Sequence, residues 1–199
     1  KRHYETACNY VIRDDASAYH TFYFDPETGD PLKGVTRQGY SDDSAWARGQ
    51  AWGISGIPFN YRYTKDESAF NLFEGMTNYF LNRLPADDVC YWDLIFGDGS
   101  GQSRDSSAAA VAVCGMHEMM KYLPETDEEK ETYRRAMHGI LRSLIQGYVN
   151  PDMHPGAPIL LHGVYSWHSG KGVDEGNIWG DYFYMEALLR FYKDWQLYW

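Results

Sequence analysis

The chain has 199 residues, 44% hydrophobic and 17% aromatic, which is enough for a packed core and excludes an intrinsically disordered protein. Its 28 acidic and 18 basic residues give a net charge of −10, which argues against a nucleic-acid partner because phosphate neutralisation needs a basic surface. No apolar run approaches the roughly 18 residues of a membrane span, so no membrane partner is expected. The three cysteines, Cys8, Cys90 and Cys114, lie far apart without a CxxC pair, which is typical of reduced thiols in a cytoplasmic protein.

The aromatic content, 17 Tyr, nine Phe and seven Trp, has two explanations. Aromatic rings stack on the C–H faces of sugar rings, and their polar tips hydrogen-bond hydroxyl groups, so the composition suits a carbohydrate-binding protein. The simpler explanation is an aromatic-rich helical core, and composition alone favours it.

In chain order, three long stretches without helical spacing precede three helical segments. The stretches are 13–43, 85–104 and 150–178, and they carry turn signals such as FGDGSGQ and HSGKGVDEGN. Within the first of them, Thr21 to Phe24 predicts a short strand of a hairpin. Connections of this length in a compact domain are usually functional. Because most of them lead into the first helix of a segment, we expect them to share one end of the molecule.

The helical segments resemble one another. The first, 44–84, is interrupted at Lys65-Asp66, the second, 105–149, is interrupted at 125–127, and the third runs from Ile178 to Trp199. Small residues dominate the first helix of each pair, and a charged face marks the second. Pro58 removes one backbone hydrogen bond and is expected to kink or break its helix. The sequence therefore predicts an all-α fold of about three helical hairpins.

The densest group of polar and aromatic residues is GVTRQGYSDDSAWARGQAW, residues 34–52. Ser41 to Ser44 are suited to cap the following helix, which is the simplest role for the Asp42-Asp43 pair. Arg48 and Trp52 are four residues apart and share a helix face. Together they could bind an anionic ring, with the guanidinium on the carboxylate and the indole on the ring. Alternatively, Arg48 is buried against an aspartate and Trp52 belongs to the core.

A second group is HGVYSWHSGK, residues 162–171. Ser166, Ser169 and Lys171 offer two hydroxyls and an ammonium on a glycine-bordered loop, which suits a sulfate or phosphate, although a solvated turn is the simpler interpretation. No P-loop pattern is present. The spacing of the histidines at 154, 162 and 168 matches no zinc motif, so no metal site is expected. Asp105 is expected to cap the helix that follows it.

Six segments closely resemble the unsaturated glucuronyl hydrolases of glycoside hydrolase family 88, also called unsaturated chondroitin disaccharide hydrolases. They are QGYSDDSAWARGQAWG, YRYTKD, YFLNRLP, VCYWDLIF, RDSSAAAVA and NIWGDYFYMEALLRF. The resemblance spans the whole chain in order, but the family domain is an (α/α)6 barrel of about twice this length. It therefore implies that residues 1–199 are the C-terminal half of a single barrel domain. In this half-barrel, long loops containing short strands lie at the active-site end. The resemblance also implies that the missing N-terminal half is a necessary partner.

The family hydrates the C4–C5 double bond of a 4,5-unsaturated glucuronic acid at the end of a glycosaminoglycan disaccharide, and the amino sugar is released. An aspartic acid protonates C4, which is general acid catalysis. The resemblance places the essential aspartates upstream of Lys1, so we expect no catalytic residue in this chain. It also implies a cytoplasmic hydrolase without a cofactor or metal.

By the same resemblance, this chain supplies the substrate-binding wall. The matching residues that surround the unsaturated uronate are His20, Gly34, Thr36, Gln38, Arg48 and Trp52. Streptococcal members that prefer sulfated disaccharides share the combination Arg37, Ser166, Ser169 and Lys171. We therefore expect a preference for sulfated, most simply 6-sulfated, unsaturated chondroitin disaccharide.

Two other functions fit parts of the sequence. An unsaturated rhamnogalacturonyl hydrolase belongs to a related barrel family, although SDDSAWARGQAW and the SxxSxK loop favour the glucuronyl hydrolase. A non-catalytic sugar-binding or interaction module of helical hairpins fits a chain without its own acid. The exposed apolar surface that a half-barrel would leave argues against that role.

Overall fold

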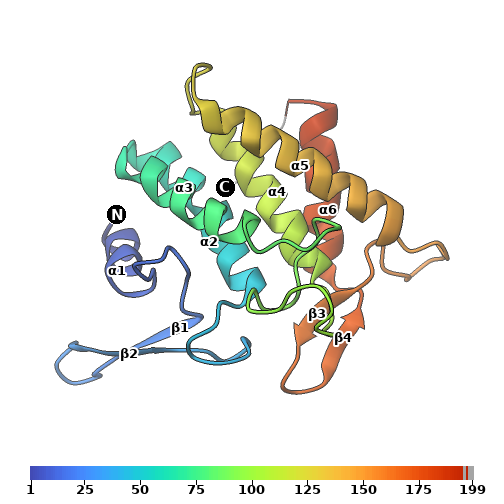
Figure 1. Ribbon diagram of the computed structural model, residues 1–199. Helices are drawn as coiled ribbons and strands as arrows, with labels where there is room; N and C mark the ends of the chain where they lie inside the picture. Colours follow the sequence, from blue (N-terminus) through green and yellow to red (C-terminus); the bar gives the residue numbers. More distant parts are fainter. Residues whose placement is uncertain (195, 197–199) are drawn as a thin grey trace.

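The structure is a computed structural model that describes residues 1–194 and 196 (Figure 1). Its helices are α1 (Arg2–Tyr10), α2 (Ala47–Thr64), α3 (Ser68–Leu81), α4 (Ser106–Met120), α5 (Glu128–Gly147) and α6 (Ile178–Tyr192). Two antiparallel hairpins join β1 (Thr21–Phe24) to β2 (Pro31–Val35), and β3 (Gly163–Ser166) to β4 (Lys171–Glu175). Part of the third predicted segment, Trp195 and residues 197–199, lies outside the described residues.

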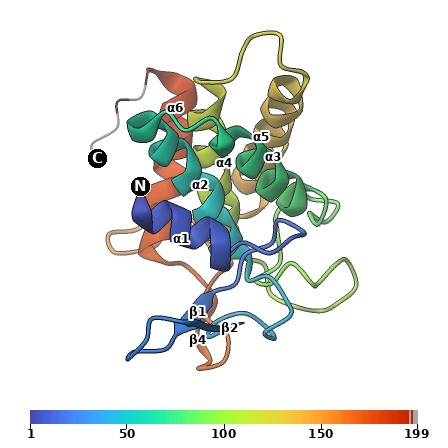
Figure 2. The same ribbon diagram turned by 90° about the vertical axis from the view of Figure 1, so that its left-hand side faces the viewer.

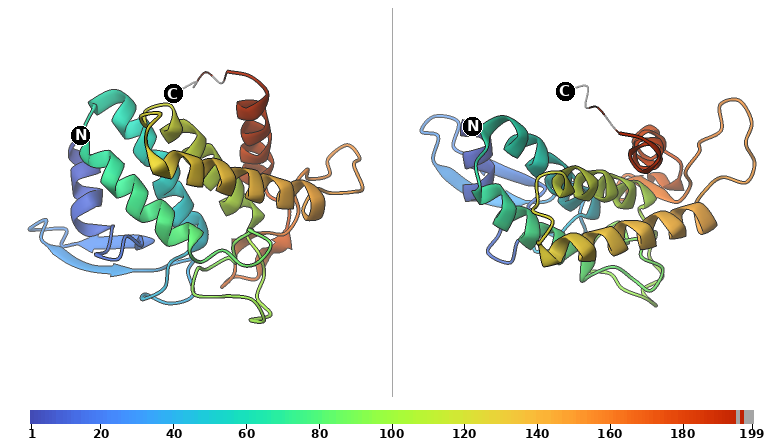
Figure 3. Two further views of the ribbon diagram at one scale, coloured as in Figure 1. Left: turned by 45° about the horizontal axis from the view of Figure 1, so that its top comes forward. Right: turned by 90° about the horizontal axis from the view of Figure 1, so that it is seen from above.

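The helices form two layers. Helix α4 lies between α2 and α6 in one layer, and α3 and α5 cover α2 and α4 from the other side (Figure 3). The predicted mostly helical fold is confirmed. Among the described residues there are two complete hairpins, α2–α3 and α4–α5, and α6 is the first helix of a third. None of the described helices is both long and apolar enough to cross a membrane.

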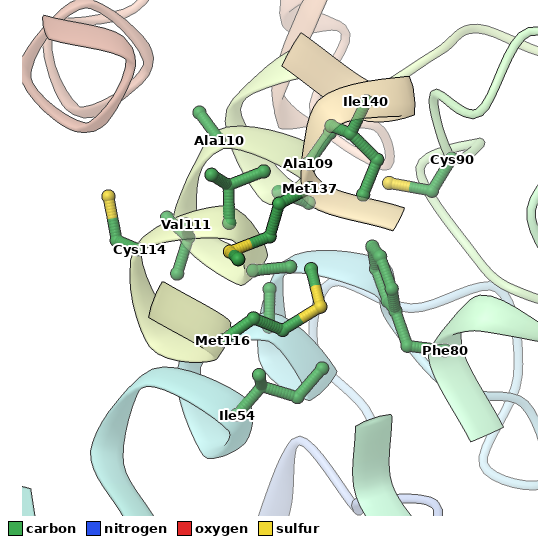
Figure 4. Close-up of a cluster of buried hydrophobic side chains, with 14 of the residues drawn as sticks. Ile54, Phe80, Cys90, Ala109, Ala110, Val111, Cys114, Met116, Met137 and Ile140 are labelled. Carbon is green, nitrogen blue, oxygen red and sulfur yellow. The ribbon is translucent and has the colours of Figure 1, made fainter. Parts of the chain in front are cut away.

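Helix α4 is the centre of the core because its small side chains let neighbouring helices approach closely. The run from Ser106 to Met116 is buried, and its alanines are fully buried. At Gly115 a Cβ atom would lie 2.7 Å from backbone atoms of Ile54 and Ser55 in α2, so only glycine permits this approach. Larger side chains from α2, α3 and α5 fill the remaining space, among them Ile54, Phe80, Met137 and Ile140 (Figure 4).

The predicted interruptions within both helical pairs are confirmed. Helix α2 ends at Lys65, which adopts a left-handed conformation with φ of 54°, and α5 begins with Asp127, whose side chain accepts a hydrogen bond from the Glu129 amide. Pro58 lies inside α2, which continues from Ala47 to Thr64, so of the two predicted outcomes, a kink or a break, the break is wrong. Pro58 packs in the buried face of α2, and burial of its ring offsets part of the cost of the lost hydrogen bond.

The long stretches gather at one end of the molecule, as predicted. Both β-hairpins and the loops before α2, α4 and α6 lie at the end where these three helices begin (Figures 1 and 2). The predicted strand Thr21–Phe24 is β1. This arrangement brings residues from three distant parts of the sequence to one end of the helical layers, where α2, α4 and α6 begin; we call this end the mouth.

Candidate functional site

A groove of about 610 Å³ opens between α1 and α2 and reaches the loop end of the molecule. Its lining includes His20, Trp46 and Trp52, and also Gly49 and Gly53 of α2, where a Cβ atom would meet the neighbouring side chains of Trp46 and Met76. Trp52 is 39% exposed and contacts Phe183 edge to face, with ring centroids 5.1 Å apart. It is therefore not the fully buried core residue that one interpretation of the sequence required, and its indole is available to a ligand.

His20 precedes β1 and is held in one protonation state by the backbone. Its Nδ1 accepts hydrogen bonds from the amides of Arg37, at 2.8 Å, and Gln38, at 3.2 Å. An acceptor nitrogen carries no hydrogen, so this network assigns the hydrogen to Nε2. Burial, together with the positive charges of Arg37 and Arg48, lowers the pKa of the imidazole. His20 therefore lies in the groove as a neutral ring with Nε2–H as its donor.

The loop after β2 holds three more of the predicted site residues. A Cβ atom at Gly34 would overlap the ring of Tyr19, so glycine is needed there. The Thr36 hydroxyl accepts from the Gly39 amide at 2.7 Å and fixes the turn. The Oε1 atom of Gln38 is buried and has no hydrogen-bond partner in the part of the chain that the structure describes. A buried acceptor of this kind is available to a ligand donor.

The prediction that Ser41 to Ser44 cap the next helix is wrong. The residue at the N-cap of α2 is Trp46, which makes no side-chain capping bond. The Asp42 carboxylate instead accepts from the Thr36 amide at 2.7 Å, and the Ser44 hydroxyl donates to Oδ2 of Asp93 at 2.6 Å. The chain turns back before the helix begins, so these side chains brace the loop.

Arg48 is buried, with only 3% exposure, and it is paired with Asp105. Its Nη1 lies 2.7 Å from Oδ2 of Asp105 and also donates to the Val164 carbonyl, at 2.6 Å. Its Nη2 donates to the Tyr165 carbonyl at 3.1 Å. The alternative of a buried arginine paired with an aspartate is therefore what the structure shows. Within the part of the chain that the structure describes, these bonds leave the Nε hydrogen and one Nη2 hydrogen unoccupied.

Asp105 occupies the N-cap position of α4, as predicted, but its carboxylate caps no helical amide. Its Oδ1 accepts from the Ser107 hydroxyl, and its Oδ2 accepts from Arg48. The start of α4 thus supplies the counter-charge for a cation on α2. The same pair joins both helices to β3 through the carbonyls that Arg48 binds.

The predicted sulfate-binding residues lie on the β3–β4 hairpin. Ser166 and Lys171 are cross-strand neighbours, and the Ser169 hydroxyl donates to the Ser166 carbonyl at 3.3 Å. Ser169 and Lys171 are exposed, and Ser166 is half-buried. The Arg37 guanidinium donates to the Tyr23 hydroxyl at 2.5 Å, and no hydrogen bond among the described residues joins it to the hairpin.

Two contacts nevertheless join the hairpin turn to other loops, and the second of them reaches the loop that carries Arg37. The Trp167 ring stacks on Trp92, with centroids 4.8 Å apart and planes 10° from parallel. His168 Nε2 lies 2.7 Å from the Gly39 carbonyl oxygen. Sequence analysis missed both Trp92 and this role of His168, because neither residue lies in a local pattern that indicates a loop-to-loop contact.

The three histidines weighed as metal ligands lie in separate environments. His154 contacts the neighbouring Pro155 carbonyl, His162 pairs with Asp174, and His168 binds Gly39. Within residues 1–194 and 196, no three His, Cys, Asp or Glu side chains are grouped as metal ligands.

The two helical layers and the mouth of long loops define a protein built from helical hairpins, with a candidate site at the loop end. Comparison with models of protein families finds no match. The unsaturated chondroitin disaccharide hydrolase of Streptococcus pyogenes serotype M1 is 75% identical over 99% of this chain and 49% of that protein. The unsaturated glucuronyl hydrolase of Bacillus sp. (strain GL1) is 40% identical over 96% of this chain and 50% of that protein.

Solved structures agree with these similarities. The crystal structure of the unsaturated glucuronyl hydrolase of Streptococcus agalactiae superposes with a TM-score of 0.96 at 72% identity, over 99% of this chain and 50% of that chain. A variant of that protein complexed with dGlcA-GalNAc6S gives a TM-score of 0.92, over 100% of this chain and 52% of that one. These neighbours have an (α/α)6 barrel fold.

Over nearly its whole length the chain corresponds to the C-terminal half of the full-length unsaturated chondroitin disaccharide hydrolases, to which it is up to 75% identical. It spans about half the length of the curated relatives that it matches.

Proposed function

We propose that this chain is the substrate-binding half of a single-domain glycoside hydrolase that hydrates the C4–C5 double bond of unsaturated glycosaminoglycan disaccharides. The observation that carries the proposal is the groove in which a neutral His20 and an exposed Trp52 lie near the buried Arg48. The named activity of relatives up to 75% identical supports it. The complex of the S. agalactiae variant with dGlcA-GalNAc6S supports the substrate class.

Each of these residues has a role that follows from its geometry. The indole of Trp52 stacks on the unsaturated ring, since an aromatic face suits a flattened sugar ring. The Nε2–H of His20 donates a hydrogen bond to the ring or to the attacking water. Arg48 binds the uronate carboxylate through its remaining hydrogens, while Asp105 holds its other edge. Gly34, Thr36 and Gln38 shape the loop that closes over the ring.

The proton comes from the other half of the barrel in this proposal. An upstream aspartic acid protonates C4, the double-bond electrons form the new C4–H bond, and water adds at C5. The resulting hemiketal opens and releases the amino sugar. No group of this chain donates the proton, and the chain needs no cofactor or metal for the roles given to it.

A preference for sulfated disaccharides extends the proposal to the β3–β4 hairpin. Arg37, Ser166, Ser169 and Lys171 offer two cations and two hydroxyls to one sulfate. Charge-assisted hydrogen bonds are worth roughly 1.5–3 kcal/mol each when buried. Because Ser169 and Lys171 are exposed here, the lower end of that range applies.

The upstream half of the barrel is the partner that the uncovered surface fits. Ile178, Tyr182 and Met185 follow one face of α6 and are 75%, 40% and 44% exposed. A second apolar groove lies between α5 and α6, where Leu141, Ile145, Leu188 and Phe191 are among the lining residues. Further helices of a closed barrel would cover both surfaces. The thiols of Cys90 and Cys114, both buried and free, suit the cytoplasmic location that we propose.

The test compares this 199-residue chain with the full-length protein. Each is incubated with 6-sulfated unsaturated chondroitin disaccharide while the absorbance of the C4–C5 double bond is followed. Activity of the full-length protein alone is the expected result. Turnover by the fragment would contradict the upstream acid, and binding by the full-length protein without turnover would support a non-catalytic sugar-binding module. A pectin-derived unsaturated substrate serves as the control for a rhamnogalacturonyl hydrolase.

A further inference from the structure

We propose that His168 is a positioning residue that fixes the β3–β4 turn against the loop 36–44, so that Ser169 and Lys171 face the same substrate group as Arg37. The inference rests on the proposed function and extends it to a residue to which that function assigns no role in binding the substrate. It makes substrate specificity depend on a contact between two loops.

The contact joins segments that are far apart in the sequence. His168 Nε2 lies 2.7 Å from the carbonyl oxygen of Gly39, 129 residues away. A carbonyl oxygen can only accept, so Nε2 carries the hydrogen and donates it. The ring also meets Trp92 edge to face, with centroids 6.1 Å apart and planes at 89°. Its orientation is therefore set by both a hydrogen bond and a ring contact.

The acceptor side of the contact has little freedom to move. A Cβ atom at Gly39 would lie 2.6 Å from the Thr36 hydroxyl oxygen and 3.0 Å from Oδ2 of Asp93. The next amide, that of Tyr40, donates to the same Asp93 oxygen at 2.8 Å. Asp93 is fully buried, so this anchor is shielded from water. The Gly39 carbonyl is thus presented to His168 by a rigid turn.

Near its tip the hairpin meets another loop at a second point, and this is a ring contact. Trp167 stacks on the fully buried Trp92, which precedes Asp93 in the chain. Beyond His168, Gly170 and Gly172 have φ angles of 64° and 57°, a conformation that gives the turn its shape. Without the His168 bond, the β3–β4 pairing still holds Ser169 and Lys171 within the hairpin, but near its tip the stacked indoles become the main contact with another loop in the described part of the chain. The distance between this stretch of the hairpin and Arg37, which lies two residues before Gly39, would then no longer be fixed.

Kinetics of the full-length enzyme test the role. The variants are His168→Ala, which removes the donor, and His168→Gln, whose side-chain amide can donate to the same carbonyl. His154→Ala is the matched control, because His154 is exposed and contacts only its neighbour's carbonyl. Each is assayed with the 6-sulfated and the unsulfated unsaturated chondroitin disaccharide.

We expect His168→Ala to raise the KM for the sulfated disaccharide by a factor about five times larger than the factor for the unsulfated one. A fivefold change corresponds to the loss of one hydrogen bond of about 1 kcal/mol. The kcat should change by less than about twofold, because the reacting carbons lie elsewhere, and His168→Gln should restore most of the KM. Equal losses on both substrates, or no rescue by glutamine, would overturn the inference.

Hydrogen–deuterium exchange makes the inference independent of activity. In His168→Ala, the amides of both 36–41 and 166–171 should exchange faster than in the wild type and in His154→Ala. Faster exchange confined to the hairpin would refute the contact between the loops. A wild type that hydrates neither disaccharide would overturn the proposed function and the specificity role with it, while the exchange experiment would still decide whether His168 joins the two loops.

Discussion

Replacing Gly115 with alanine perturbs the closest approach between two helices of the core. The added Cβ atom would lie 2.7 Å from backbone atoms of α2, and ordinary contact begins at 3.4 Å, so the helices must separate by about 0.7 Å. Overpacking of this kind costs about 1–3 kcal/mol. Because the Cβ atom would meet backbone atoms, which cannot swing aside, the upper part of this range, about 2–3 kcal/mol, applies. Alanine in a helix interior returns about 0.8–1 kcal/mol, so we expect a net loss of about 1–2 kcal/mol.

The assay is thermal unfolding of the full-length protein, where this loss lowers the midpoint by about 1–2 °C, because the unfolding entropy of a chain about twice this length is large. Gly147→Ala is the matched control, since Gly147 is the exposed last residue of α5 and a Cβ atom there meets nothing within 4 Å. The control should raise stability by about 0.4–1 kcal/mol. A Gly115→Ala protein as stable as the wild type would refute the claim that α2 and α4 need glycine at this point.

Three further predictions concern the candidate site in the full-length protein. The double variant Arg37→His, Ser166→Gly should raise the KM for the 6-sulfated disaccharide and leave the KM for the unsulfated one nearly unchanged. Steady-state kinetics measure both values, and equal changes in the two would count against the sulfate site. Asp105→Ala leaves the Arg48 charge buried and unpaired, so chemical denaturation should show a loss on the order of 3–5 kcal/mol, and a neutral effect would contradict the role of the pair. Folding lowers the pKa of His20, so the unfolded chain binds a proton before the folded protein does as the pH falls. The stability contributed by the neutral His20 ring is therefore complete above the ordinary histidine pKa near 6.5 and is lost as the pH falls through the lowered pKa. Unfolding midpoints measured from pH 8 to 5 should therefore fall less steeply in His20→Asn than in the wild type, and identical slopes would show that the ring is not held neutral.

The helical hairpins could be predicted because their signals are local. Apolar spacing marks the helices, and the chemistry of Lys65 and Asp127 marks where α2 ends and α5 begins. The strand at Thr21–Phe24 was also predicted from its own residues. The effect of Pro58 was less certain from sequence, since the cost of one lost hydrogen bond depends on the packing that surrounds the helix.

The site could be predicted only in part because its contacts join distant residues. Arg48 and Trp52 share a helix face in the sequence, yet the partner of Arg48 is 57 residues away at Asp105. The misplaced cap at 41–44 has the same cause, since Asp42 finds the Thr36 amide when the loop folds back. No local pattern could indicate that His168 would reach Gly39. Such contacts exist only after the helices have placed three loops at one end.

The carboxylates at the loop end of the molecule are consistent with our proposal that the catalytic acid belongs to the other half of the barrel. Asp42 accepts a bond from a backbone amide, Asp93 accepts from an amide and a hydroxyl, and Asp105 accepts from Arg48 and Ser107. Asp43 lines a different groove, on the side of Arg83 and away from His20 and Trp52. A general acid must present a proton to the reacting carbon, and carboxylates already engaged as acceptors for protein donors are poorly suited to that task. The acids of this chain hold its cation and its loops in place, which is the division of labour expected of a binding wall that faces an acid supplied from elsewhere in the barrel.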